Sequence, residues 1–403
     1  MDYKWLYKIR YSDRDNYENE YKSRINSTSS YKYEFKVSGF PAFVLITPEL
    51  LQLIYDIRSY DKALYKKRSS LPDVALESYM RSCLIDEVKQ TNDLEGVAST
   101  RKEINDILTK SDTTNTRLIG IVNKYSLLMR NNDIPLSKCS DIRALYNDLV
   151  LEEIKQSNPE NLPDGEIFRS GRVYVKDRNS GQTIHEGVFP ETLITETMSS
   201  VLNIIGDPSY NALINIAVIH YMFGYIHPFY DGNGRTSRFI SSYLISKELE
   251  RLTSLRLSYA IKKDSSAYYR MFKLANDPIN RGELTGFVIY LLELLKDTLV
   301  SLTDALTDYI SLLDYCNNII AGLDYNDFYK ELLSVIMQNT LFGYCGLSIQ
   351  ELCEETKKSD TTVRNALKTL DSAGLIRSDK GRAYRYRINV EKLEKLDKFT
   401  ENA

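Results

Sequence analysis

The most informative segment of this chain reads His227-Pro228-Phe229-Tyr230-Asp231-Gly232-Asn233-Gly234-Arg235-Thr236-Ser237-Arg238. It brings a titratable base, a carboxylate, two glycines and two arginines into one short stretch of chain. Each of these groups suits the handling of a nucleotide phosphate. A solvated surface loop explains any one of them alone, but it does not explain all of them together.

One helix should end inside this segment and another should begin. Residues 211–226 are apolar on nearly every side, which predicts a buried helix that is too short to span a membrane. Pro228 disfavours the helical conformation at His227, so this helix should end there. A second helix should follow and bury the apolar residues between 239 and 245. The free N–H groups at its start, with the helix dipole behind them, predict an anion site.

The polar side chains of the segment take roles by their chemistry. His227 has an ordinary pKa near ~6.5, which suits a general base for an incoming hydroxyl. Asp231 offers the oxygen ligand that Mg²⁺ uses when it bridges phosphates. Asn233 can orient a phosphate or the attacking group. Arg235 and Arg238 lie three residues apart on one helix face, and their planar forks match phosphate oxygens.

The segment matches every fixed position of the pattern H-P-F-x-(D/E)-G-N-G-R-x-x-R, so the chain resembles the Fic family. A weaker resemblance covers residues 40–300. Within it, residues 172–188, with a turn at Asp177–Gly181, resemble the β-hairpin flap of the family, and residues 267–270 resemble the stretch near its adenine pocket. The resemblance implies a mainly α-helical core that transfers AMP from ATP to a Ser, Thr or Tyr hydroxyl of a protein, with the chain itself among the candidate targets.

The resemblance also implies a role for each site residue. His227 would be the catalytic base and Asp231 the ligand of a Mg²⁺ cofactor. The ATP-binding residues would be Gly232, Asn233, Gly234, Arg235, Arg238, Tyr268 and Tyr269. Among these, the two glycines let the backbone adopt left-handed angles and approach the phosphates, and the two arginines would hold the β and γ groups.

A second motif, Thr91-Asn92-Asp93-Leu94-Glu95-Gly96, resembles the inhibitory pattern (S/T)-x-x-x-E-(G/N) of many Fic proteins. Glu95 could form a bidentate pair with Arg238 and so take away the arginine that the γ-phosphate needs. A charge-assisted bond of this kind contributes roughly 1.5–3 kcal/mol, enough to suppress most turnover. The simpler alternative is an ordinary helix C-terminus with Gly96 as its cap.

Composition predicts a multi-unit protein of a reducing compartment. The chain has 403 residues, 43% of them hydrophobic, and a net charge of −3, which argues against a protein that coats nucleic acid. Its five cysteines are scattered without a C-x-x-C pair, and residues 1–10 lack the apolar block of a signal peptide. We therefore expect a cytoplasmic protein without a membrane partner, whose polar residues 11–35 form an irregular arm.

We expect three parts: an N-terminal helical region with the inhibitory helix (1–110), a catalytic core with trailing helices (111–324), and a winged helix-turn-helix domain (325–403). In the last part, two helices, a turn and a hairpin follow one another between residues 347 and 388. The hairpin carries Arg377, Lys380, Arg382, Arg385 and Arg387, which could contact DNA phosphates. Nearby acidic residues offset that charge, and winged helices also dock proteins or form homodimers.

Two classes of function compete. The first is a nucleotidyltransferase, a protein adenylyltransferase restrained by Glu95, with removal of AMP as a second chemistry that the family resemblance allows. The second is a DNA-binding regulator that uses the Fic core as a nucleotide sensor. A sensor needs no hydroxyl base, so His227 favours the enzyme. The chain has no G-x-x-x-x-G-K-(S/T) loop, and a helix rather than a strand precedes Gly232, which excludes a P-loop kinase and a Rossmann site.

Overall fold

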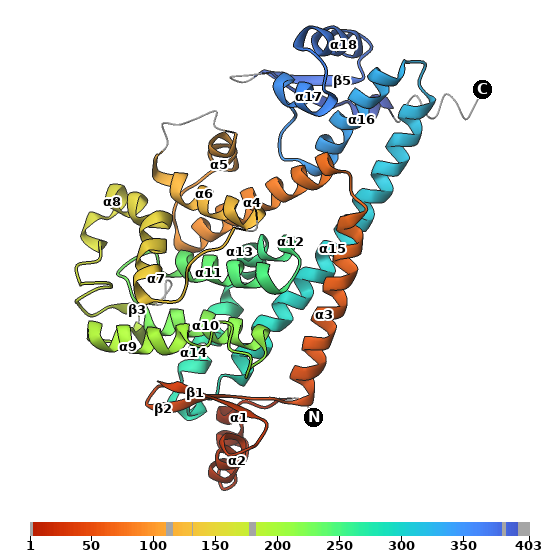
Figure 1. The fold of residues 1–403 in the computed structure, drawn as a ribbon. Helices are drawn as coiled ribbons and strands as arrows, with labels where there is room; N and C mark the ends of the chain where they lie inside the picture. Colours follow the sequence, from red (N-terminus) through yellow and green to blue (C-terminus); the bar gives the residue numbers. More distant parts are fainter. Residues whose placement is uncertain (1–2, 110–115, 131, 177–182, 381–383, 394–403) are drawn as a thin grey trace. The chain divides into compact units, whose positions relative to one another are not determined.

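The computed structural model describes residues 3–109, 116–130, 132–176, 183–380 and 384–393. The protein is mainly helical, and the described residues contain three two-stranded antiparallel hairpins (Figure 1). This is the fold class that the sequence predicts for the core and its flap.

The chain packs into two compact units. The first comprises residues 1–62 and 86–300, and the second comprises residues 63–85 and 301–403. Three long helices contribute to both units: α3 (Pro48–Ser69), α4 (Asp73–Glu95) and α15 (Thr285–Gly322). This division follows packing, whereas the three-part division above follows function and stays a prediction.

The N-terminal segment is regular, contrary to the irregular arm expected for residues 11–35. Its elements are α1 (Leu6–Ser12), α2 (Tyr17–Ile25), β1 (Ser30–Val37) and β2 (Phe40–Leu45). Leu6, Ile9 and Tyr17 form a small buried cluster, and the buried Arg24 lies 3.0 Å from the carboxylate of Glu283. These few long-range contacts stabilise regular structure in the segment. Its polar composition alone did not indicate them, because tertiary contacts can override local propensity.

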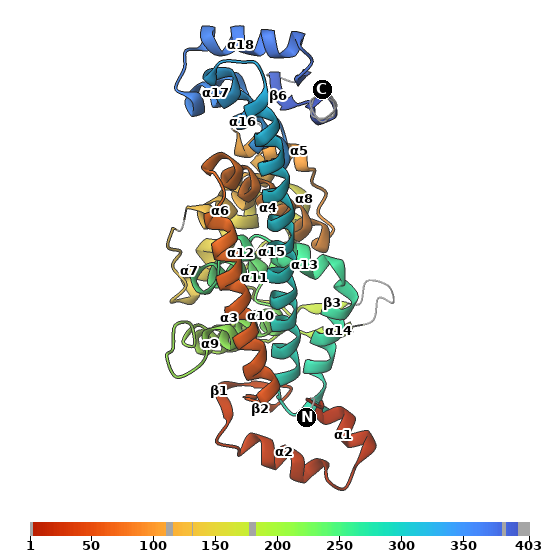
Figure 2. The same cartoon turned by 90° about the vertical axis from the view of Figure 1, so that its right-hand side faces the viewer.

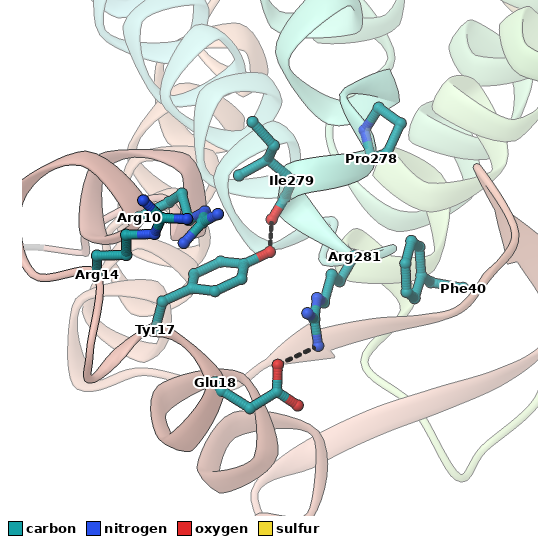
Figure 3. Close-up of a pocket in the computed structure, with 8 residues that line it drawn as sticks. All are labelled: Arg10, Arg14, Tyr17, Glu18, Phe40, Pro278, Ile279 and Arg281. Carbon is teal, nitrogen blue, oxygen red and sulfur yellow. Dashed lines mark hydrogen bonds and ion pairs between the residues drawn. The ribbon is translucent and has the colours of Figure 1, made fainter.

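Figure 3 shows how this segment meets the 3₁₀ turn η3 (Pro278–Asn280). The Tyr17 hydroxyl donates to the Ile279 carbonyl at 2.6 Å, and the Arg281 guanidinium lies 2.8 Å from the Glu18 carboxylate. These residues line an open pocket together with Arg10, Arg14, Phe40 and Pro278. None of the site residues predicted from the sequence lines this pocket.

The remaining helices of the first unit surround two central ones, α10 (Ala212–Ile226) and α11 (Asn233–Glu248), as Figure 1 shows. Before the flap lie α5 (Arg101–Leu108), α6 (Thr116–Met129), α7 (Cys139–Tyr146), the π-helical turn η1 (Asn147–Leu151), α8 (Glu152–Ser157) and the 3₁₀ turn η2 (Pro159–Asn161). After the flap lie α9 (Glu191–Leu202), α12 (Arg251–Ser254), α13 (Leu257–Lys263) and α14 (Ser265–Asn276). Nearly every residue of α10 is buried, which explains its apolar composition.

Two strands form the flap predicted from the sequence. β3 (Tyr174–Lys176) pairs antiparallel with β4 (Thr183–Glu186), with Tyr174 opposite Glu186. The turn predicted at Asp177–Gly181 lies outside the described residues.

The second unit contains α16 (Asp327–Phe342), α17 (Ile349–Thr356), α18 (Asp360–Ser372) and the hairpin of β5 (Ile376–Lys380) and β6 (Tyr384–Ile388). Figure 2 shows these helices with β6 beside them. The first half of α4 packs in this unit, where the Tyr79 and Phe342 rings meet edge to face and Arg81 lies 3.2 Å from Glu351. Among the described residues, no helix is both long and apolar enough to cross a membrane.

Candidate active site

The segment that joins α10 to α11 has the conformation that its sequence predicts. Helix α10 ends at Ile226, and His227 adopts a left-handed conformation with φ 52°. Gly232 is left-handed as well, with φ 78°, and α11 begins at the next residue. Between them, the ring of Phe229 is fully buried and stacks on Tyr146 with centroids 3.7 Å apart. The apolar anchor and the two left-handed residues hold the polar groups of the loop in a fixed arrangement.

The imidazole of His227 is neutral at physiological pH. Its pKa is lowered to about 4, mainly by burial and to a smaller extent by the neighbouring His185 of the flap. Its Nδ1 lies 3.4 Å from the carbonyl oxygen of Gly224. With the proton on Nδ1 facing that carbonyl, Nε2 carries the lone pair that accepts a proton.

Arg169, which the sequence analysis did not single out, fixes the backbone of this loop. Its guanidinium is fully buried and donates to three carbonyl oxygens, those of His227 at 2.9 Å, Val188 at 2.7 Å and Gly171. Gly171 precedes the first flap strand and Val188 follows the second, whereas His227 is the predicted base. Arg169 therefore couples the flap to the position of His227.

Helix α11 begins with two of the predicted ATP-binding residues, Asn233 and Gly234. Its first N–H groups lack intrahelical acceptors, as at every helix N-terminus. The Asn233 side chain is turned back onto the loop: its Oδ1 accepts from Phe229 N at 2.9 Å and its Nδ2 donates to Phe229 O at 2.8 Å. Asn233 thus closes the loop with its amide and leaves its backbone N–H at the helix start. A Cβ on Gly234 would overlap the carboxylate of Glu95, so this glycine makes room for that side chain.

Arg235 is turned away from the loop. It is almost completely buried, and its Nη1 lies 2.6 Å from the carboxylate of Glu153 in α8. Its Nη2 lies 3.5 Å from Asp231, whose side chain is 28% exposed. Asp231 thus keeps part of its side chain in solvent, while its Oδ1 also accepts from Gly232 N. One carboxylate together with the phosphates of a nucleotide is a ligand set that suits Mg²⁺.

Arg238 makes the contact predicted with the inhibitory motif. Its Nη2 donates to Glu95 Oε1 at 2.7 Å and to the Thr91 carbonyl at 3.0 Å, and its Nε donates to the Thr91 hydroxyl at 2.8 Å. Burial acts to lower the pKa of Arg238, but Glu95, Tyr268 and Tyr269 together outweigh it, so the pKa lies above its ordinary value. Arg238 is 1% exposed, so the pair is well shielded from salt.

The motif also forms the ordinary helix C-terminus, capped by Gly96, that was the simpler alternative. Gly96 is left-handed, with φ 76°, and its N–H donates to Asp93 O while Val97 N donates to Asn92 O. These bonds form a Schellman cap. Gly96 therefore ends α4 directly after Glu95 and fixes where the last turn of the helix presents this carboxylate.

The two predicted adenine-contact residues lie near Arg238, since their phenols contribute to its electrostatics. Tyr268 is buried, and its hydroxyl lies 2.9 Å from Nε2 of His220. Tyr269 is half-buried and meets the Tyr268 ring edge to face. Of the pair, Tyr269 is the more exposed residue.

Sequence reasoning missed Arg169 and Glu153. Each is a single charged residue outside any recognisable pattern, and each finds its partner 58 and 82 residues away, respectively. Only the burial of a charge in an apolar region could have signalled them, and burial is not visible in one sequence.

Comparisons with known proteins agree with this geometry. Residues 138–245 match the family model of the Fic/DOC family. "Protein adenylyltransferase Fic" of Drosophila ananassae is 31% identical over 140 residues, which are 34% of this chain and 24% of that protein. The protein of the same name from Drosophila melanogaster is 31% identical over 34% of this chain and 25% of its own length. The chain therefore aligns with only about a quarter of these relatives.

Among solved structures, the crystal structure of a Fic family protein from Desulfovibrio desulfuricans G20 shares the fold. Its TM-score is 0.54 at 20% identity, over 85% of this chain and 97% of that one. The segment 138–245 is therefore similar to the Fic/DOC family, and the fold is similar to that of a Fic family protein.

Proposed function

We propose that this chain is a protein adenylyltransferase that transfers AMP from ATP to a hydroxyl of a protein, and that Glu95 restrains it. The observation that carries the proposal is the state and position of the His227 imidazole. A neutral imidazole lies in the loop that leads into the start of α11, in a domain whose curated relatives are named adenylyltransferases.

In the proposed reaction, Nε2 of His227 takes the proton of the target hydroxyl. The hydroxyl oxygen forms a bond to the α-phosphorus of ATP while the bond between that phosphorus and the bridging oxygen to the β-phosphate breaks. Pyrophosphate leaves with the bonding electrons, and the target keeps AMP. A base with a pKa below 7 is deprotonated before the hydroxyl arrives, so no separate activation step is needed.

The N–H groups at the start of α11 would bind phosphate oxygens, because both their direction and the helix dipole favour an anion. Asp231 would hold Mg²⁺, which when bound neutralises charge on the phosphates. Arg235 would act mainly through its bonds to Glu153 and Asp231, which fix the start of α11 and the metal ligand. Tyr269 would stack against the adenine.

The restraint would arise because the Glu95 carboxylate takes the place of the γ-phosphate. It pairs with Arg238 and fills the space over Gly234. An incoming ATP would have to displace this carboxylate or bind with its phosphates in a geometry that the target hydroxyl cannot attack in line.

The other class of function, a DNA-binding regulator with the Fic core as a nucleotide sensor, would need the same nucleotide site without a base. The accessible lone pair of His227 has no role in such a sensor. We therefore place the enzyme first.

Two radioactive nucleotides distinguish the reactions. The purified chain and a cell extract are incubated with Mg²⁺ and ATP labelled at either the α- or the γ-phosphate. AMP transfer labels protein from the α-label only and adds the mass of AMP to the labelled species. Label from the γ-phosphate alone would show phosphoryl transfer and refute the proposal.

A further inference from the structure

The second unit contains a helix pair that the proposed enzyme does not use. Helices α17 and α18 are joined by residues 357–359, where Lys357 is left-handed with φ 53° and so turns the chain sharply. Ser348 caps α17 and Ser359 caps α18, each by accepting from a backbone N–H of the first helical turn. The antiparallel β5–β6 hairpin follows directly, with Ile376 opposite Ile388 (Figures 1 and 2).

Helix α18 has two distinct faces. One face is buried in the unit and consists of Val363, Ala366, Leu367 and Leu370. The opposite face is exposed and entirely polar, and Thr361, Asn365 and Lys368 follow one another along its centre at spacings of four and three residues. Within the described part of the chain, the side chains of these three residues make no hydrogen bond or ion pair. They are available to a ligand.

We propose that this face of α18 binds in the major groove of duplex DNA. The groove admits an α-helix, and the residue types on this face are those that recognise base edges there. Asn365 can make two bonds to adenine N6 and N7, Lys368 can donate to guanine O6 and N7, and Thr361 can contact a thymine methyl or a phosphate.

The charges around α18 support DNA as its ligand. Lys357 and Lys358 are exposed in the turn directly before α18, where phosphates flank a helix in the groove. Residues 344–392 carry ten Lys and Arg against seven Asp and Glu. On α18 itself, Asp360 is paired with Arg364, which offsets the acidic residue nearest the turn.

Three of the hairpin arginines to which the sequence analysis assigned DNA contacts have partners within the protein. Arg385 donates to Gly346 O and to the Glu351 carboxylate, Arg387 donates to Tyr344 O, and Arg377 pairs with Glu391. These arginines hold the hairpin in place. Arg382 lies outside the described residues.

A protein partner fits the face less well. Protein interfaces are built around buried aromatic or aliphatic anchors. The exposed face of α18 offers none, since the large apolar side chains exposed in the described part of this unit all lie outside the helix: Tyr65, Leu312, Tyr315, Tyr344 and Tyr384. The polar face therefore favours nucleic acid.

The experiment uses the full chain, because part of α4 packs in this unit. A library of random-sequence DNA duplexes is selected for binding, and the affinities for the enriched duplex and for a random duplex are measured by fluorescence anisotropy at several salt concentrations. Asn365→Ala should weaken binding to the enriched duplex about tenfold or more and change binding to the random duplex little, since one bidentate base contact is lost.

The double variant Lys357→Ala with Lys358→Ala should weaken binding to both duplexes alike and reduce the salt slope by about 2, one unit for each phosphate contact. Lys32→Ala with Lys36→Ala, two exposed lysines of β1, makes the same charge change in the other unit and should leave both affinities unchanged. Thermal unfolding verifies that every variant is folded.

Two results would overturn the proposal. In the first, no sequence is enriched and the chain binds no duplex at low salt, which would leave the face of α18 to a protein. In the second, duplexes bind but the α18 variants and the β1 variant lose affinity equally, which would mean that general charge, and not this helix, accounts for binding.

Discussion

Replacing Glu95 with glycine should release the transferase activity. The perturbation removes the carboxylate that bonds Arg238 at 2.7 Å and that fills the space over Gly234. Arg238 keeps its two bonds to Thr91, so the guanidinium stays in place and becomes free to bind the γ-phosphate.

The magnitude follows from the bond between Arg238 and Glu95. A charge-assisted hydrogen bond contributes about 1.5–3 kcal/mol, and the Glu95 side chain is 22% exposed, which places its bond in the lower half of that range. About 2 kcal/mol corresponds to about thirtyfold in rate.

The assay is self-labelling with ATP labelled at the α-phosphate, followed over time, together with calorimetry of ATP binding. Asp93→Gly serves as the matched control, since it removes the same charge from the same helical turn but pairs with Lys89 and not with Arg238. If Glu95→Gly still binds ATP but labels no faster than Asp93→Gly, the ion pair does not restrain the enzyme, and the motif is only the capped end of α4.

Four further outcomes are expected. His227→Ala in the Glu95→Gly background should abolish labelling, because the imidazole acts on the target hydroxyl. The calorimetric affinity for ATP should change by less than about threefold. Labelling as fast as in Glu95→Gly alone would contradict this. In the same Glu95→Gly background, kcat/KM should not fall as the pH drops through 6.5. The reason is that the pKa of His227 is lowered to about 4, so the base stays deprotonated above about pH 4. A fall centred near pH 6.5 would show that the imidazole is not buried in solution. Asp231→Ala should lose the dependence of nucleotide affinity on Mg²⁺, whereas Asp231→Glu should keep part of it; equal affinity with and without Mg²⁺ in the wild type would remove the metal from the site. Arg169→Met should lower the free energy of unfolding by about 3 kcal/mol in urea titrations, since it leaves three carbonyls without their donor, and a loss below about 0.5 kcal/mol would mean that water replaces the guanidinium.

The sequence alone predicted the local course of the chain through the site. Pro228 ends α10 at His227, and glycine at 232 permits the left-handed turn that begins α11. The two helices expected after residue 347 likewise form, as α17 and α18. Each of these features depends on residues within a few positions of one another, where backbone sterics and helical periodicity act directly.

Tertiary structure decided which groups became partners. Glu95 meets Arg238 across 143 residues, and the sequence suggested this pair only because a family pattern resembles both motifs. No local rule indicated that Asn233 would bond to the loop backbone, that Glu153 would hold Arg235, or that Arg169 would pin the loop of His227. A buried charge takes whichever partner the packed core brings to it, and that choice depends on the whole fold because an unpaired charge in the interior costs too much to persist.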